Sequence, residues 1–233
     1  MNLSGKTAII TGGTGALGSV VASTMYGSGT NIAIPLFSHA TAAAPGRDSA
    51  RMFSARADLT VEGDVHDFVL SVLGKFGRVD ILVNAAGGYT GGKLVEESAV
   101  NDFDAMMKLN FTSVLNTCRA VLPVMKKQGY GRIVNIAAMP ALTVKPRMGP
   151  YSVSKRAVVT LTETIADEVK GQGVTVNAIA PSIILTPANQ KGMPEADFSK
   201  WVTPEEIAVL TMFLCSDEAK SVNGNVIKIF GGV

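Results

Sequence analysis

The chain has 233 residues, of which 47% are apolar and 17% charged, and its formal net charge is +2. This length and composition are typical of one compact α/β domain, so we expect a single domain over residues 1–233. The small net charge and the scattered basic residues argue against a nucleic-acid partner, and we expect a small-molecule ligand. No apolar run reaches membrane-spanning length and the first strand begins close to Met1, so we expect a cytoplasmic protein without a membrane anchor. The two cysteines, Cys118 and Cys215, are far apart, which predicts neither a metal site nor a disulfide.

Apolar, strand-like runs alternate with helical patterns along the chain. The expected strands are Thr7–Thr11, Ile32–Phe37, Met52–Ala57, Asp80–Asn84, Arg132–Ala137, Val174–Ala180 and Val226–Phe230. One expected helix begins near Ala16, and the others span Val61–Phe76, Asn101–Lys127, Tyr151–Lys170 and Pro204–Leu214. Apolar strands separated by helices predict an α/β fold with a doubly wound parallel sheet, the Rossmann fold, whose ligand lies at the carboxyl ends of the strands.

Two stretches look irregular, Ser38–Asp48 and Pro187–Ser199, because both combine proline with small or polar residues. The first follows the second strand, where the ribose of a cofactor would lie. The second follows the sixth strand, where a lid over the substrate would lie.

A glycine-rich turn, Thr11–Gly18, joins the first strand to the first helix. Glycines permit such a sharp turn and let backbone amides approach a pyrophosphate at the helix N-terminus. Gly13, Gly15 and Gly18 match the G-x-G-x-x-G pattern in this context, although a glycine-rich turn without a ligand is the alternative. The expected cofactor contacts here are Gly12, Gly13, Thr14, Gly15, Ala16, Leu17 and Gly18.

Tyr151 and Lys155 are four residues apart at the start of a predicted helix, so both side chains lie on one face. A nearby ammonium favours the phenolate, and we therefore expect Lys155 to lower the pKa of Tyr151 and make it a proton donor near neutral pH. The same lysine could bind a nicotinamide ribose. By itself this pair is also compatible with an ordinary exposed helix face.

Several motifs occur together and in order along nearly the whole chain. They are the glycine turn Thr11–Gly18, Asp58-Leu59, Asn84-Ala-Ala-Gly87, Asn110, the pair Tyr151 and Lys155, and Pro181 through Thr186. In this combination the sequence resembles the short-chain dehydrogenase/reductase family. The resemblance implies an oxidoreductase that transfers hydride between a nicotinamide and a carbonyl-like substrate.

The resemblance also implies roles for individual residues. Tyr151 would be the acid/base, and Lys155 would tune the phenol and hold the ribose. Asn110 would support a water-linked proton relay to the lysine, the alternative being a polar residue that packs at a helix kink. The other implied cofactor contacts are Asp58 and Leu59 at the adenine, Asn84, Ala85, Ala86 and Gly87 along the cofactor, and Pro181, Ile184 and Thr186 near the nicotinamide.

The sequence departs from the family pattern at three places. Ala16 replaces one glycine of the usual turn, which adds only a methyl group. Ala138 occupies the position of the catalytic serine, thirteen residues before Tyr151, so a hydroxyl that would share the developing negative charge is missing. The second strand ends in Ile34-Pro-Leu-Phe37 and lacks the acid typical of members that prefer NAD, yet no arginine clamp follows, so NAD and NADP both remain open.

The missing serine favours an acceptor that spreads the incoming charge over a conjugated ring, such as a quinonoid dihydropteridine. The sequence also resembles the dihydropteridine reductase branch of the family at Gly12–Ser19, Ala86–Gly92 and Thr186–Trp201. In this interpretation Ala138 and Tyr89 contact the substrate, and Tyr89 or Trp201 stacks on its ring. Met139, Met148 and Met193 would flank an apolar pocket, although an ordinary core role is the alternative.

Two alternatives remain for the function. An ordinary carbonyl or alcohol oxidoreductase would need a substitute donor such as Ser152, Thr143 or a water near Ala138. A weakly catalytic nucleotide-binding scaffold would keep the glycine turn without needing Tyr151. By resemblance, the long helices Asn101–Lys127 and Tyr151–Lys170 would form the interface of a homodimer or homotetramer.

Overall fold

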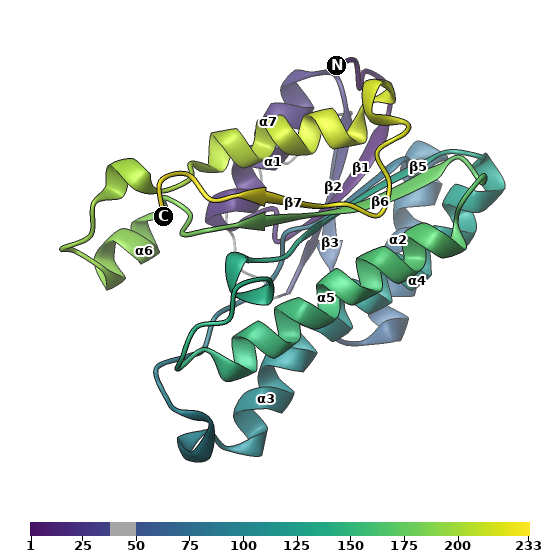
Figure 1. The fold of residues 1–233 in the computed structure, drawn as a ribbon. Helices are drawn as coiled ribbons and strands as arrows, with labels where there is room; N and C mark the ends of the chain where they lie inside the picture. Colours follow the sequence, from purple (N-terminus) through teal and green to yellow (C-terminus); the bar gives the residue numbers. More distant parts are fainter. Residues whose placement is uncertain (38–49) are drawn as a thin grey trace.

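The computed structural model describes residues 1–37 and 50–233. Its centre is a seven-stranded parallel sheet with the order β3-β2-β1-β4-β5-β6-β7 (Figure 1). The strands are β1 (Thr7–Thr11), β2 (Asn31–Leu36), β3 (Met52–Arg56), β4 (Ile81–Asn84), β5 (Gly131–Ile136), β6 (Val174–Pro181) and β7 (Val226–Ile229). The predicted doubly wound parallel sheet is confirmed. Its strand order reverses between β1 and β4, which is where such sheets bind ligands.

Helices cover both faces of this sheet (Figure 1). The helices α1 (Ala16–Gly27) and α7 (Pro204–Cys215) pack on one face, and α2 (Glu62–Phe76), α4 (Ser113–Gln128) and α5 (Gly149–Glu168) cover the other. Residues such as Ile10 and Ile34 form the core beneath the first layer, and Leu82 and Ile133 belong to the core beneath the second. Because β1, β4, β5 and β6 are buried along their whole length, they need the continuous apolar runs from which they were predicted. None of the helices in the described ranges is both long enough and apolar enough to span a membrane.

Two segments differ from the sequence-based prediction. The single helix predicted over Asn101–Lys127 consists of α3 (Val100–Met106), a π-helical turn (Met107–Thr112) and α4, and Asn110 lies in the π turn. The stretch predicted to be irregular, Pro187–Ser199, contains a short helix, α6 (Pro187–Gly192). Thr186 caps α6 by accepting a hydrogen bond from the Asn189 amide. The first residue of the helix is Pro187, a residue that is common at this position because its missing N–H costs nothing there. The other irregular stretch, Ser38–Asp48, lies outside the described residues.

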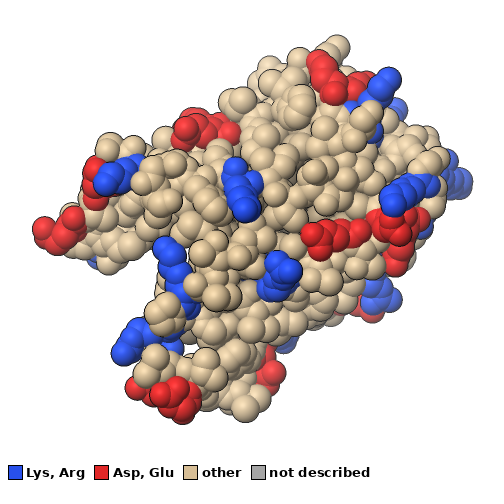
Figure 2. All heavy atoms as spheres, viewed as in Figure 1, with Lys and Arg blue, Asp and Glu red and all other residues tan. Residues whose placement is uncertain are grey.

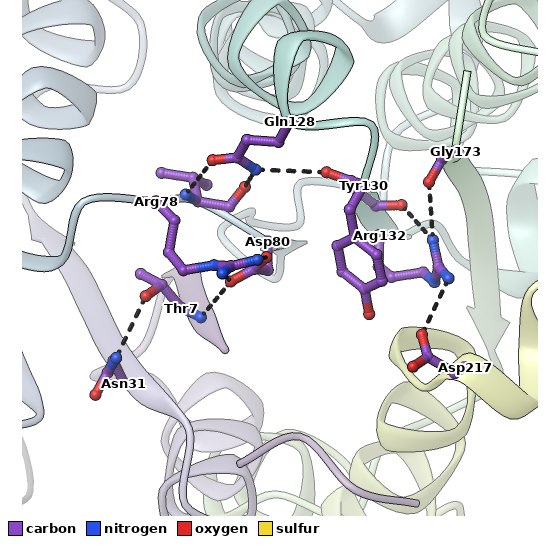
Figure 3. A network of polar contacts seen from close by, with 11 residues as sticks. Thr7, Asn31, Arg78, Asp80, Gln128, Tyr130, Arg132, Gly173 and Asp217 are labelled. Atoms are coloured by element: carbon purple, nitrogen blue, oxygen red, sulfur yellow. Dashed lines mark hydrogen bonds and ion pairs between the residues drawn. The ribbon is translucent and has the colours of Figure 1, made fainter. Parts of the chain in front are cut away.

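Charged and polar side chains tie together the amino ends of the strands, at the edge opposite the ligand crevice (Figure 3). The buried Asp80 carboxylate accepts the Thr7 amide at 2.9 Å and both arms of the Arg78 guanidinium at 2.7 and 2.6 Å. Arg132 at the start of β5 pairs with Asp217 at 3.4 Å. The buried Asp80 carboxylate thus has its partners within the scaffold, and the network links β1, β4 and β5 at this edge.

The turn between β1 and α1 depends on two glycines. Gly12 has φ +66°, and a Cβ atom there would lie 2.8 Å from the Ala86 amide nitrogen. A Cβ atom on Gly18 would overlap the Gly12 carbonyl group, which cannot move without breaking the turn. At Gly13 the nearest atoms belong to the side chain of Ile34, not to the backbone. The turn is therefore more sensitive at Gly12 and Gly18 than at Gly13.

We expect Gly18→Ala to destabilise the fold by about 1–3 kcal/mol, because the added methyl group overlaps backbone atoms. It should also weaken binding of the nicotinamide cofactor that the family resemblance implies, since the turn expected to contact that cofactor would shift. Gly74→Ala, at an exposed position of α2 with open space around it, is the control and should raise stability by about 0.5–1 kcal/mol. Urea unfolding and NADH fluorescence titration measure the two effects. Equal stability of the two variants would contradict the expectation.

Candidate active site

A cavity of about 720 Å³ lies at the carboxyl ends of the central strands, where the strand order reverses. Its volume falls in the range of about 300–1,000 Å³ that is usual for small-molecule sites. The walls come from the segments after β4, β5 and β6, from the start of α5 and from α6. Most of the lining is apolar and includes Met139, Met148 and Met193, as expected for a pocket that excludes water.

Tyr151 and Lys155 both line this cavity from the first turns of α5. Lys155 is buried, and its ammonium donates a hydrogen bond to the Ile136 carbonyl at 2.8 Å. Burial lowers the pKa of Lys155 to about 8. Burial, together with the neighbouring Tyr89 phenol, raises the pKa of Tyr151 to about 12. The phenol is therefore protonated at neutral pH and can donate a proton into the cavity.

The pKa of Tyr151 moves in the direction opposite to the sequence-based expectation. Proximity in sequence predicted that the Lys155 ammonium would lower this pKa. In the structure the ammonium is directed to the end of β5, and loss of water around the phenol dominates. The four-residue spacing placed both groups on one side of α5, but it did not determine where the ammonium points.

Asn110 connects the π-helical turn to the cavity wall. Its amide nitrogen donates to the Gly88 carbonyl and the Ser154 hydroxyl, both at 3.0 Å, and its oxygen accepts the Gly88 amide at 2.9 Å. A Cβ atom added to Gly87 would lie 2.8 Å from the Asn110 oxygen and 3.3 Å from the Lys155 nitrogen. The segment after β4 is thus held against Asn110 and Lys155 and has no room for a side chain at Gly87.

Tyr89 stands at the rim of the cavity beside Tyr151. The two rings meet edge to face, with centroids 5.1 Å apart and planes at 79°. Tyr89 is 58% exposed, so much of its ring is free to contact a ligand. Trp201, the other aromatic candidate, is buried against Phe198 and does not line the cavity. Of the two predicted stacking residues, only Tyr89 is in position.

Ala138 lines the cavity. It has a methyl group at the position where the family pattern has a serine hydroxyl. Neither substitute donor suggested by the sequence reaches this wall. Ser152 is buried with its hydroxyl unpaired among the described residues, and Thr143 is exposed outside the lining. Ser182 is in the lining, but its hydroxyl donates to the Phe230 carbonyl at 2.8 Å. Tyr151 therefore offers the best-placed hydroxyl donor in the inner part of the cavity.

Many of the residues predicted to contact the cofactor lie in or beside the cavity. Leu17, Ala85, Gly87, Pro181 and Ile184 line the cavity, and Gly12 to Gly18 form the adjoining turn. The Ala86 amide is held by the Thr11 hydroxyl at 3.1 Å, which brings the segment after β4 against that turn. The first turn of α1 carries no acidic residue and no side-chain cap, so its amides can face an anion.

Three other predicted contacts have side chains that are used within the protein. Asn84 is fully buried and bonds to Asn135 and Thr117, both at 2.8 Å. The Asp58 carboxylate accepts the Thr60 amide and hydroxyl, which lower its pKa. Thr186 caps α6, and the carbonyl of Leu59, the neighbour of Asp58, accepts a bond from Asn116. These residues are near the expected cofactor path but shape it through the backbone.

Sequence reasoning missed three features of the site. The Ile136 carbonyl receives the Lys155 ammonium, Ser154 links Asn110 to the Tyr151 carbonyl, and Lys145 lines the mouth. A backbone carbonyl leaves no signal in the sequence. The position of Ser154 three residues after Tyr151 was a detectable signal, because a serine there can bond back along the helix.

Comparison with known proteins shows which protein family has this fold and these sequence motifs. The sequence profile of the short chain dehydrogenase family matches residues 6–197. D-beta-hydroxybutyrate dehydrogenase from Rhizobium meliloti is 33% identical, with 97% of this chain and 98% of that protein covered. A 3-oxoacyl-[acyl-carrier-protein] reductase from Thermotoga maritima is 36% identical, covering 76% of this chain and 74% of the other. The crystal structure of NAD⁺-bound xylitol dehydrogenase superposes with a TM-score of 0.91 at 28% identity over the full length of both chains.

These comparisons confirm the family-level resemblance and the nicotinamide cofactor. They do not show the local resemblance to dihydropteridine reductase. The two relatives are named for a hydroxy acid and for an oxoacyl compound, which agrees better with ordinary carbonyl and alcohol chemistry.

The buried Lys155 makes stability depend on pH in a direction that can be measured. The folded state holds this proton less tightly than the unfolded state, so wild-type stability should rise between about pH 8 and 10.5. Lys155→Met removes that dependence. The stability of the wild type relative to this variant should therefore increase by about 2 kcal/mol from pH 7 to pH 10. Urea unfolding at both pH values measures it, with Lys191→Met on exposed α6 as the control.

Proposed function

The chain belongs to the short-chain dehydrogenase family, and on this premise we propose that it interconverts a secondary alcohol and a ketone on a small molecule, using NAD(H) or NADP(H). The observation that carries the proposal is the Tyr151 hydroxyl, which has no hydrogen-bond partner among the described residues, in a mostly apolar cavity that the buried Lys155 also lines. Both relatives named above support this substrate chemistry through their names.

The cofactor site fits a dinucleotide. Gly12 and Gly18 lie in a tight turn where added Cβ atoms would overlap backbone atoms. The first amides of α1 have no side-chain cap, which favours a pyrophosphate at this helix end. Leu17, Gly87 and Ile184 would hold the nicotinamide half along the cavity wall. When bound, the nicotinamide supplies or accepts the hydride. The described end of β2 carries no acidic residue that would repel the 2′-phosphate of NADP, so both NAD and NADP fit this proposal.

Tyr151 would act as the general acid in reduction and the general base in oxidation. Its protonated phenol would donate to the substrate oxygen as that oxygen gains negative charge, while the Lys155 ammonium stays bound to the Ile136 carbonyl in the same cavity wall. Asn110 would hold the segment at Gly88 and so keep the wall beside Lys155 in place. The apolar lining excludes water, which strengthens the electrostatic interactions inside the cavity.

A second candidate is reduction of a conjugated acceptor such as a quinonoid dihydropteridine. Two observations favour it. Ala138 leaves the inner wall without the hydroxyl that would share the charge of an alkoxide, and a conjugated ring spreads that charge over several atoms. Tyr89 offers an exposed ring face at the rim on which a flat heterocycle could stack.

Tyr151→Phe tests whether the protein is catalytic at all. It should lower kcat for ketone reduction by about 10²-fold or more, because the proton donor is lost, while the NADH dissociation constant changes little. Tyr130→Phe at the opposite edge of the sheet removes another phenol hydroxyl that is unpaired among the described residues and is the control. Steady-state NADH oxidation over a ketone and quinone panel measures both. Unchanged turnover in Tyr151→Phe would favour a nucleotide-binding scaffold.

Ala138→Ser separates the two substrate classes. If simple ketones are the substrates, the new hydroxyl should raise kcat/KM for them about ten-fold or more, since one donor to a developing alkoxide is commonly worth that much. Turnover of a quinonoid dihydropterin should change little. Ser152→Ala is the control and should leave both activities unchanged, because that hydroxyl lies outside the cavity lining. No gain with ketones, together with unchanged turnover of the dihydropterin, would favour the conjugated acceptor over the ketone.

A further inference from the structure

We propose that the substrate carries an anionic group, a carboxylate, sulfonate or phosphate, and that Lys145 at the cavity mouth pairs with it. This inference rests on the proposed function, because it names the substrate class that the same cavity accepts. It concerns a residue to which neither the sequence motifs nor the proposed reaction gives a role.

The charges around the cavity are all of one sign. Among the described residues, the lining contains no aspartate or glutamate and two cations, Lys145 and Lys155. The Lys155 ammonium is buried and committed to the Ile136 carbonyl. Lys145 is exposed and forms no ion pair with any residue of the described ranges. A ligand in the cavity therefore meets an uncompensated positive charge at the mouth.

The loop that carries Lys145 is fastened to the opposite rim. The Gly92 amide donates to the Arg147 carbonyl at 2.8 Å, and the Arg147 guanidinium donates to the Gly92 carbonyl at 2.9 Å. Arg147 has φ +64°, a conformation that residues other than glycine adopt only when their surroundings hold them. The two hydrogen bonds therefore join the loop with Lys145 and Arg147 to the glycine-rich segment that contains Tyr89 and Gly92. This double link places the backbone near Lys145 at a defined point of the mouth.

The surface near the mouth has the same character. Figure 2 shows Lys and Arg side chains on the walls of the notch at the left of the molecule, between the lobe that carries α6 and the lobe that carries α3. The nearby Lys93 is neutralised by Asp102 at 3.1 Å, and Arg147 has no acidic partner among the described residues. Positive potential at a concave, poorly hydrated site attracts anions and raises their local concentration.

The lining next to Lys145 is apolar. Pro140, Met139, Met148 and Met193 share the cavity with it, so an anion that extends from the ammonium into the cavity has few competing polar groups around it. Tyr151 and Lys145 line the same cavity, so a ligand that fills it can offer a reacting oxygen to the phenol and an anionic group to the ammonium. Oxo acids or hydroxy acids, and their sulfonate or phosphate counterparts, carry both groups.

The test compares ligands that differ only in charge. Acetoacetate and acetoacetamide, with 2-oxopropanesulfonate and acetonyl phosphate as further arms, are titrated calorimetrically into the protein with and without NAD⁺. We expect the acetoacetate anion to bind about ten-fold more tightly than the amide, with the preference weakening as salt rises. The strongest of the three anions identifies the anionic group.

Lys145→Gln should remove this preference, Lys145→Arg should retain most of it, and Lys145→Glu should reverse it. Lys191→Gln makes the same change of charge on α6 outside the lining and should leave the preference intact. Equal binding of acid and amide by the wild type, binding of neither, or an unchanged preference in Lys145→Gln would overturn the inference. The binding titrations test only the preference for anions. If they fail, turnover of neutral ketones that depends on Tyr151 would still support the proposed function.

Discussion

The hydrogen bond from the buried Lys155 ammonium to the Ile136 carbonyl is the contact on which the site depends. It joins α5 to the end of β5 across the bottom of the cavity and places a positive charge where water is excluded. A buried ammonium is costly unless it is hydrogen-bonded, and its lowered pKa reflects this cost. The hydrogen bond to the Ile136 carbonyl offsets part of this cost.

The surrounding contacts serve the same arrangement. Gly87 has no side chain, so the segment after β4 can approach both Asn110 and Lys155. The π-helical turn directs Asn110 inward to bind that segment, and Ser154 connects Asn110 back to the carbonyl of Tyr151. Irregular helical turns of this kind are often found at functional sites, because they redirect a side chain that a regular helix would place elsewhere. A chain of hydrogen bonds therefore links the backbone of Tyr151, through Ser154 and Asn110, to the segment after β4.

The inner wall and the mouth of the cavity have different chemistry. The inner wall is mostly apolar, with a methyl group at Ala138, and Tyr151 is its best-placed hydroxyl donor to a developing negative charge. The mouth carries an exposed lysine on a loop held in place by Arg147 and Gly92. A substrate with both a charged group and a reacting oxygen could use both halves, whereas a neutral flat ring would use mainly the rim at Tyr89.

The sequence by itself determined the parallel sheet, the glycine turn and the pair Tyr151 and Lys155, because these depend on local rules: apolar runs, backbone freedom at glycine, and the helical repeat. It also showed that Ala138 lacks a hydroxyl. Only the tertiary structure decided where the Lys155 ammonium points, that burial raises the pKa of Tyr151, that Asn84 is used inside the core, and that Lys145 reaches the cavity. Each of these depends on which distant segments meet, and on how much water they exclude, which no local pattern records.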